Sequence, residues 1–381
     1  MTLVGFAVFL LFGVCLVLLG ANQETLSADL GLDLTQLGLL GSALALGIGV
    51  GVAGAGPVVD RSQRKPLFVG AALLAALALG WVEPGMSLAR VLAQLAAVGV
   101  AIGVQETLVN TCIAQRHGLA AAKPLIIVHA GATLGAALAP LAIASQAANP
   151  SWIDVFHTTA AAQLALAAAC MCLRFPEPPT HPGSAAREPL PLRELLPFLW
   201  ISFAYVGVET TLSLYVVPYA GSIGVAEARA LHAMTCFWGG LLLGRLTLLT
   251  ARQRIDARFL AWAGLAGACT IGLGIGLRSE AIEGIYGLAG LGMGFVFPVL
   301  IALAAERAPA ARGTATGLAG GAGALGGLAI PPLHGNLGDH FGVAAALLAL
   351  IFWCGVMMLA AIVALRQTPT TANASPRSSA R

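Results

Sequence analysis

The sequence predicts an all-α membrane protein in which twelve transmembrane helices form two pseudo-symmetric six-helix bundles. First, 58% of the 381 residues are hydrophobic and only 10% are charged. Second, the charges fall between apolar stretches of about 20 residues, which is the length that crosses a bilayer as a helix. Third, motifs of the first half recur in the second half at a nearly constant offset. This composition excludes a soluble enzyme.

The spans follow from hydropathy interrupted by charges, Pro and Gly. The first span has no Lys or Arg before it and no clear cleavage site, so we expect a retained helix and not a removed signal peptide. In the first half we expect spans at residues 2–27, 35–59, 66–82, 86–114, 124–147 and 152–173. In the second half we expect spans at residues 196–219, 226–250, 258–277, 282–305, 314–336 and 341–365.

The longest polar connection is rich in Pro and separates the two halves. It divides the chain into an N-terminal six-helix bundle (1–174), a cytoplasmic linker (175–194) and a C-terminal six-helix bundle (195–366). Residues 367–381, rich in Ser and Ala, are expected to form a disordered cytoplasmic tail.

The basic residues predict the orientation. Sixteen of the 20 Lys and Arg residues fall in alternate connections and the C-terminal tail, whereas the opposite connections carry mainly acidic residues. By the positive-inside rule, we expect both termini in the cytoplasm of a cell whose plasma (bacterial inner) membrane holds the protein. The basic residues are spread over six segments and form no single patch, so no nucleic-acid partner is expected.

Three glutamates, Glu24, Glu106 and Glu209, fall inside apolar stretches. A carboxyl group at bilayer depth costs several kcal/mol when charged and usually faces a cavity or a partner. Because burial disfavours the charged form, such a group can bind a proton on one side of the membrane and release it on the other. We therefore expect these glutamates to couple transport to protons, or to Na⁺. The alternative is a structural hydrogen bond between helices, and it is strongest for Glu24.

Polar residues next to these glutamates are the first candidates for substrate binding. Glu106 shares a helix face with Asn110, four residues later, and Gln105 lies beside it. Asn22 and Gln23 precede Glu24.

Other candidate substrate-binding residues lie farther along the chain. His129 could relay a proton because imidazole ionises near neutral pH, although a hydrogen bond between helices is the commoner role. Tyr205, Trp238 and Phe297 could stack on an apolar part of a ligand, or pack in the core. Arg245 could neutralise an anion or extend to the cytoplasmic surface.

The two halves indicate a duplication. Gly99-x3-Gly103 recurs as Gly290-x3-Gly294, and Gly135-x4-Pro140 recurs as Gly326-x4-Pro331, both at an offset of 191 residues. Transport proteins are often built from such internal repeats.

Twelve spans in a 6+6 arrangement resemble the major facilitator superfamily. Its signature between spans two and three is similar to Gly56-Pro57-Val58-Val59-Asp60-Arg61-Ser62-Gln63-Arg64-Lys65. The resemblance implies that Asp60, Arg61, Arg64 and Lys65 form a cytoplasmic conformational latch; the alternative is a solvated loop. Gly103 to Thr111 and Tyr205 to Thr211 resemble segments of the fucose:proton symporter-like branch.

Together these features predict a secondary active transporter that moves a small polar solute, sugar-like or an organic metabolite, by proton-coupled alternating access. The alternative is a proton-coupled exporter of drugs or apolar metabolites, and a membrane receptor without transport activity is less favoured. We expect no enzyme activity because no catalytic motif is found. We also expect no cofactor and no metal site. The expected partners are a small-molecule substrate, protons or Na⁺ and the lipid bilayer, and the chain is expected to be a monomer.

Overall fold

The computed structural model describes residues 2–59, 63–117, 122–146, 151–173, 175, 190–250, 256–278, 280–309 and 311–367. The regular secondary structure of these residues is helical throughout. The predicted linker and tail fall largely outside them. The first half contains α1 (Thr2–Ala21), α2 (Gln23–Leu30), α3 (Leu34–Val59), α4 (Arg64–Gly80), α5 (Leu88–His117), α6 (Ala122–Ala144) and α7 (Trp152–Met171).

The described residues of the second half form eight helices. These are α8 (Leu192–Ser222), α9 (Glu227–Thr250), α10 (Ala257–Gly276), α11 (Ile282–Met293), α12 (Val296–Arg307), α13 (Arg312–Phe341), α14 (Val343–Leu348) and α15 (Leu350–Arg366). Three of the predicted spans are each made of two helices in sequence: α1 with α2, α11 with α12, and α14 with α15. With the other nine helices they give twelve spans, which confirms the predicted fold class. Nine helical segments among the described residues are long and apolar enough to cross a membrane.

The first span is not the single continuous helix that was expected, because it is interrupted at Asn22. The Asn22 side chain donates a hydrogen bond to the Leu18 carbonyl oxygen at 2.8 Å, and its backbone has φ −113° and ψ 17°. Asn side chains compete with the helix for backbone partners in this way. As a result, residues 23–30 form a separate short helix, α2, of much lower hydrophobicity.

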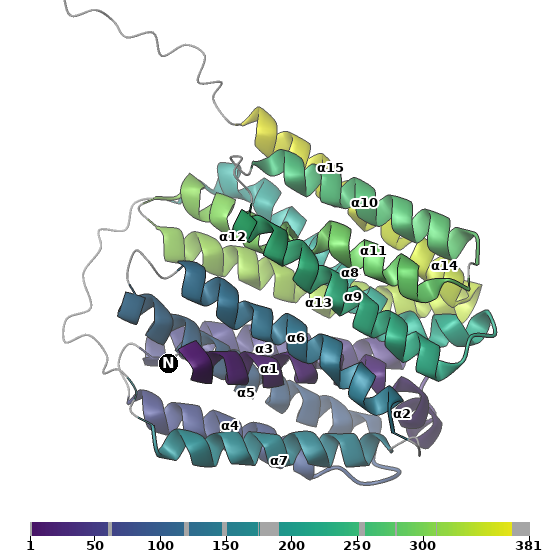
Figure 1. The fold of residues 1–381 in the computed structure, drawn as a ribbon, viewed down its shortest axis with the longest axis horizontal. Coiled ribbons are helices and arrows are strands. Elements are labelled where there is room, and N and C mark those ends of the chain that lie inside the picture. The colour runs from purple at the N-terminus through teal and green to yellow at the C-terminus, as the bar shows by residue number, and fades with distance from the viewer. Residues whose placement is uncertain are drawn as a thin grey trace, which may run out of the picture.

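The helices form two bundles that lie side by side (Figure 1). In the first bundle α3 packs on α5, α1 on α6, and α4 on α5 and α7. In the second, α9 packs on α11, α8 on α13, and α10 on α15. The bundles meet mainly where α3 contacts α13 and where α6 contacts α9.

The repeated glycines allow close approach between helix backbones at equivalent places in the two bundles. A Cβ atom on Gly103 of α5 would lie 2.6 Å from the Ile48 carbonyl oxygen of α3. In the second bundle, a Cβ on Gly294 would overlap the Leu241 carbonyl of α9. Because small residues are what lets helices pack tightly in lipid, the recurring sequence pattern corresponds to recurring helix pairs.

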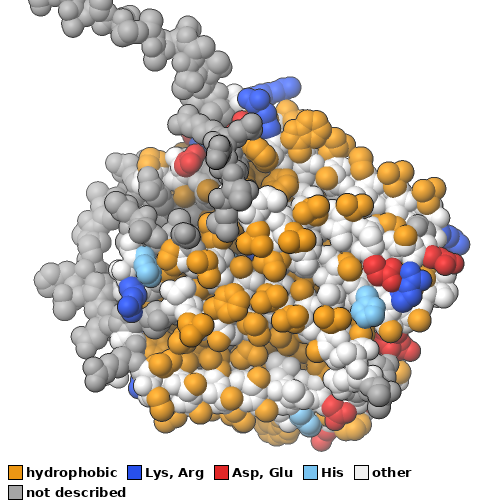
Figure 2. All heavy atoms as spheres, in the orientation of Figure 1, with side chains coloured by type: hydrophobic (Ala, Val, Ile, Leu, Met, Phe, Trp, Pro, Cys, Tyr) orange, Lys and Arg blue, Asp and Glu red, His pale blue; other side chains and the backbone are white. Residues whose placement is uncertain are grey.

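The molecular surface has a broad apolar region, with charged side chains gathered toward its edges (Figure 2). We call the end that carries Asp33, Glu83, Asp154 and Asp339 the acidic end. We call the opposite end the basic end; it carries Arg64, Lys65, Arg116, Arg307 and Arg366. The apolar surface between the two ends matches the part of a membrane protein that contacts lipid tails.

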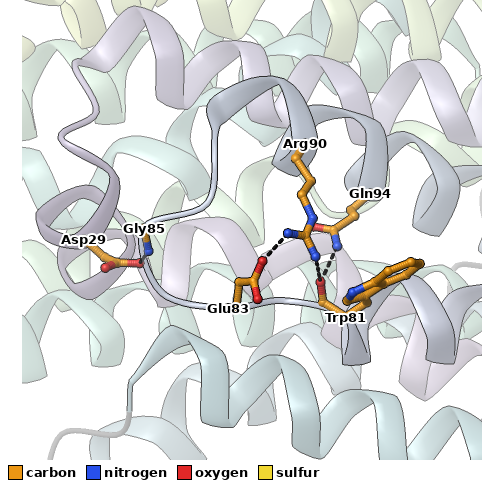
Figure 3. A network of polar contacts seen from close by, with 6 residues as sticks. All are labelled: Asp29, Trp81, Glu83, Gly85, Arg90 and Gln94. Carbon is orange, nitrogen blue, oxygen red and sulfur yellow. Dashed lines mark hydrogen bonds and ion pairs between the residues drawn. The ribbon is translucent and has the colours of Figure 1, made fainter.

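A polar network holds the α4–α5 connection at the acidic end (Figure 3). Arg90 pairs with Glu83 and donates a hydrogen bond to the Trp81 carbonyl at 3.2 Å. Gln94 donates to the same carbonyl at 2.6 Å. Asp29 of α2 accepts from the Gly85 amide at 3.2 Å, so the network also anchors α2 to this connection.

Candidate functional site

A cavity of about 560 Å³ lies between the two bundles. Its walls are mainly apolar and come from both bundles: Phe9, Phe12, Leu16, Leu19, Leu44, Ile48, Val52, Val206, Leu214, Trp238, Phe297 and Leu318. Its polar lining is Glu106, His129, Thr133, Glu209, Thr210, Ser213, Arg245 and Thr314. This size and this mixture of walls are typical of a site for a small organic molecule.

The first bundle contributes Glu106 from α5 and His129 from α6. The Glu106 carboxyl lines the cavity and has neither a hydrogen bond nor an ion pair with the described part of the chain. His129 Nε2 lies 3.2 Å from Asn110 Oδ1, and its ring packs against Phe9 at a centroid distance of 4.5 Å. Asn110 therefore contacts the site through His129 and does not itself line the cavity.

Arg245 of α9 connects the two bundles inside the cavity. Its Nη1 donates to Thr133 Oγ1 of α6 at 2.7 Å, and its Nε donates to the Gly294 carbonyl at 3.3 Å. Thr133 lies eleven residues after the start of α6, or about 16 Å along the helix axis. The guanidinium therefore contacts the middle of α6 and points into the cavity, and does not extend to the surface.

The second bundle contributes Glu209 from the middle of α8. The Tyr205 hydroxyl, one turn earlier, lies near both the Glu209 carboxyl and the Arg245 guanidinium but outside hydrogen-bond geometry with either. Trp238 Nε1 donates to Ser213 Oγ at 3.0 Å, which fixes the indole at the cavity wall. Phe297 also lines the cavity and stacks on the buried Tyr205 ring at 6.5 Å.

Other residues predicted to bind substrate or protons lie away from this cavity. Gln105 is fully buried and donates to Gln163 Oε1 at 3.1 Å, between α5 and α7. The Asn22 side chain donates its hydrogen bond to the Leu18 carbonyl. Gln23 and Glu24 line a separate pocket of about 320 Å³ near the acidic end. The structure therefore brings Glu106, His129, Glu209, Trp238 and Phe297 together and leaves the polar residues around Glu24 outside.

The predicted latch is described only in part. Asp60 and Arg61 lie outside the described residues. Arg64 is buried and donates to Gln115 Oε1 at 2.6 Å and to the Val59 carbonyl at 3.3 Å, both within the first bundle. Lys65 is half-buried at the start of α4.

The acidic end is closed by contacts between the bundles. Asp339, near the end of α13, accepts hydrogen bonds from the Leu34 amide at 2.9 Å and from the Thr35 amide at 2.9 Å. The Thr35 hydroxyl also donates to Asp339. In addition, the Tyr215 hydroxyl lies 2.8 Å from the Leu34 carbonyl of α3 and 2.9 Å from the Pro331 carbonyl of α13. Residues nearer the basic end, such as Thr314 and Leu318, line the cavity instead of closing it.

The environment of Asp339 favours its charged form. Partial burial opposes ionisation, but the hydrogen bonds from Thr35 and from the Leu34 amide outweigh this effect and lower the pKa of Asp339 below its usual 3.8. The helix dipole of α3 acts in the same direction because its positive end faces the carboxylate.

Sequence reasoning did not identify this closure, nor Thr133 and Ser213 in the cavity. Asp339 reads as one more acidic loop residue, and only its position beside the first turn of α3 reveals its role. Thr133 and Ser213 are single small hydroxyl residues in apolar helices, where a hydrogen bond to the preceding turn is common. No spacing rule distinguishes them from such residues.

Comparison with known proteins agrees with this architecture. The family model described as Major Facilitator Superfamily matches residues 2–286. The chain is 23% identical over 351 residues to a protein of Bacillus subtilis (strain 168) described as the uncharacterized MFS-type transporter YfkL. That alignment covers 88% of each chain.

Three solved structures share the fold. A bacterial homolog of the human lysosomal transporter Spinster, inward-facing and unoccupied, has a TM-score of 0.79 at 15% identity and covers 96% of each chain. A D-xylose-proton symporter has a TM-score of 0.77 at 16% identity, covering 97% of each chain. FucP in the outward conformation has a TM-score of 0.66 at 18% identity, covering 95% of this chain and 98% of its own. The chain is therefore a multi-pass membrane transporter that belongs to the major facilitator superfamily.

Proposed function

We propose that this protein moves a small amphipathic organic solute across the membrane by proton-coupled alternating access, with Glu106 as the proton-binding group. The observation that carries the proposal is a carboxyl group without a protein partner among the described residues, facing a mainly apolar cavity between two bundles. A charged carboxylate in such a place is costly. Proton binding removes that cost and leaves a neutral acid that can pass through an occluded state.

The proton and the substrate are coupled if both must be present before the bundles can rock. Glu106 belongs to the first bundle, whereas Glu209 and Arg245 belong to the second. A solute bound between them contacts both bundles at once. Its binding therefore stabilises the conformation in which the two sides of the cavity approach each other, as expected when a ligand shifts a two-state equilibrium. The D-xylose-proton symporter among the structural neighbours supports proton coupling by analogy of fold only.

The chemical class of the solute is inferred from the side chains that line the cavity. Aromatic and aliphatic side chains dominate the lining, and Gln105, Asn22 and Gln23 point their amides elsewhere. This favours a solute with an apolar body and one polar group. A neutral, sugar-like solute is the second candidate, and the hydroxyl groups of Thr210, Ser213 and Thr314 in the lining favour it. Import and export are both compatible with this geometry.

Proteoliposomes that contain a trapped pH-sensitive dye test the proposal. A panel of neutral, acidic and basic amphipathic compounds, together with free sugars, is added outside in sodium-free buffer. We expect at least one amphipathic compound to drive a proton flux in the wild-type protein, and Glu106→Gln to abolish that flux. The matched control is Glu83→Gln, because Glu83 lies in an exposed pair with Arg90 outside the cavity.

Folding of each variant is checked by size-exclusion chromatography and thermal unfolding in detergent. A compound transported equally by wild type and Glu106→Gln, with unchanged proton flux, would contradict the assignment of Glu106. A proton flux driven by sugars alone would favour the neutral, sugar-like solute over the amphipathic one.

A further inference from the structure

Arg245 is a cation in the cavity that the proposed proton cycle does not use. Its side chain forms no ion pair with a carboxylate in the part of the chain that the structure describes. Two of its donors are occupied, one by Thr133 Oγ1 and one by the Gly294 carbonyl. A guanidinium has five N–H donors, so the remaining ones have no protein acceptor among the described residues.

An intramembrane charge without an ion-pair partner is costly. The charge of Arg245 acts on Glu209 of α8 and on the titratable His129 of α6. Neither side chain forms an ion pair with Arg245 in the described part of the chain. The guanidinium is instead held in position by a hydroxyl and a backbone carbonyl, both of which are neutral. This arrangement orients the planar guanidinium and leaves its positive charge available to bind an anionic ligand.

We infer that Arg245 is the substrate-recognition residue and that the substrate is an amphipathic organic carboxylate; this inference rests on the proposed transport function. The planar fork of a guanidinium matches the two oxygens of a carboxylate, which it can bind bidentately. Thr133 holds Nη1 from the opposite bundle, so a carboxylate bound to Arg245 lies at the junction of the two bundles. The apolar body then lies against Trp238 and Phe297 in the second bundle and Phe12 in the first.

The charge of the substrate also explains why a proton is needed. Glu106 and Glu209 line the same cavity. In their charged forms, both repel the carboxylate of the substrate. Protonation of Glu106 removes one of these negative charges before the anion enters. The anion and the proton therefore favour each other's binding and move in the same direction, and the coupling requires no direct contact between Glu106 and the substrate.

Thermal unfolding of the purified protein tests the inference with matched ligands. The panel contains benzoate, 2-naphthoate and decanoate, the corresponding amides, and the amines benzylamine, 2-naphthylmethylamine and decylamine. We expect at least one carboxylate to raise the unfolding temperature in a dose-dependent way, whereas its amide and its amine do not. Stabilisation by an amide or an amine equal to that of the carboxylate, or no stabilisation by any carboxylate, would overturn the inference.

Variants locate the site. Arg245→Gln is expected to weaken the carboxylate at least about tenfold, the loss expected for a charge-assisted hydrogen-bonded pair. Arg245→Lys keeps the charge without the fork and is expected to retain part of the affinity. Thr133→Val is expected to weaken binding by about threefold to tenfold, because the guanidinium loses one of the two hydrogen bonds that orient it. The matched control, Arg258→Gln, removes an exposed cation outside the cavity and is expected to bind like wild type.

The carboxylate-binding test and the proton-flux test can fail independently of each other. Carboxylate binding that Arg245→Gln leaves unchanged refutes the inference, even if proton flux still depends on Glu106. Conversely, selective carboxylate binding that depends on Arg245, with no proton flux, supports the anion site and refutes the proton cycle. If Arg245→Gln does not give a folded protein, the inference is tested by comparing each carboxylate with its amide in the wild-type protein.

Discussion

Asp339 of the second bundle caps the first turn of α3 in the first bundle. Its carboxylate accepts from the amides of Leu34 and Thr35. The Asp33 carboxylate accepts from the Gln36 amide at 2.7 Å, and the Asp33 amide donates to Gln36 Oε1 at 3.1 Å. The first amides of a helix have no partner within the helix. Here a residue of the same bundle satisfies one of them, and a residue of the opposite bundle satisfies two. This cap exists only while the acidic end is closed.

Removal of the Asp339 carboxylate is expected to shift the protein toward opening at the acidic end. Loss of a helix cap costs about 1 kcal/mol, which corresponds to about a fivefold change in the ratio of closed to open molecules. Asp339→Ala therefore increases the open population about fivefold. The measurement is the spin-label distance distribution between Ala28→Cys and Phe341→Cys in a background without native cysteines. An unchanged distribution would show that the cap does not contribute to closure.

The cap is expected to be independent of pH over the range in which the transporter works. A group whose pKa is lowered in the closed conformation stabilises closure above its usual pKa, and this contribution is lost as the pH falls through the lowered value. For Asp339 the loss begins below 3.8. Asp339→Asn serves as the control because it removes the titratable carboxyl group. Between about pH 5 and pH 8, any pH-dependent change in the spin-label distances is expected to persist in Asp339→Asn.

A methyl group added at Gly335 is expected to open the acidic end through steric overlap alone. A Cβ atom on Gly335 of α13 would overlap the Leu34 carbonyl and lie 2.6 Å from the Tyr215 hydroxyl. Overpacking costs about 1–3 kcal/mol, so Gly335→Ala is expected to raise the open population by about 5- to 150-fold. Gly313→Ala in the same helix is the control, because a Cβ there has no neighbour within 4 Å. Equal effects of the two variants on the spin-label distances would rule out this steric effect.

Glycines within a bundle are expected to affect stability and not conformation. Gly103→Ala places a Cβ 2.6 Å from the Ile48 carbonyl inside the first bundle, and this interface does not change when the bundles rock. We expect a fall in unfolding temperature with unaltered spin-label distances. Gly70→Ala, in the middle of α4 with no neighbour within 4 Å, is expected to leave both unchanged. A change of conformational balance in Gly103→Ala without loss of stability would contradict rigid-body behaviour of the bundle.

The sequence predicted the fold because its signals are long and redundant. Apolar length, charge alternation and the 191-residue repeat all refer to whole helices, and each is averaged over many residues. The interruption at Asn22 was not predicted because one Asn at the end of an apolar stretch is also compatible with a continuous helix. Its side-chain hydrogen bond to Leu18 is what divides α1 from α2.

The candidate site was harder to predict because it depends on which way a side chain faces. Glu106 and Gln105 are adjacent in sequence, yet one lines the cavity and the other is paired with Gln163 in the bundle interior. Adjacent residues on a helix point about 100° apart, and the sequence alone gives no absolute rotation. The distance of Glu24 from the cavity has a related reason, since the break at Asn22 places it in a separate pocket near the acidic end.

The composition of the acidic-end cap determines where it is vulnerable to mutation. Two of its three donors are peptide N–H groups, which every residue except Pro supplies. Replacements at positions 34 and 35 therefore leave most of the cap intact, whereas nearly any replacement at position 339 removes the acceptor for all three donors. Mutational loss of this cap is therefore concentrated at a single position, residue 339.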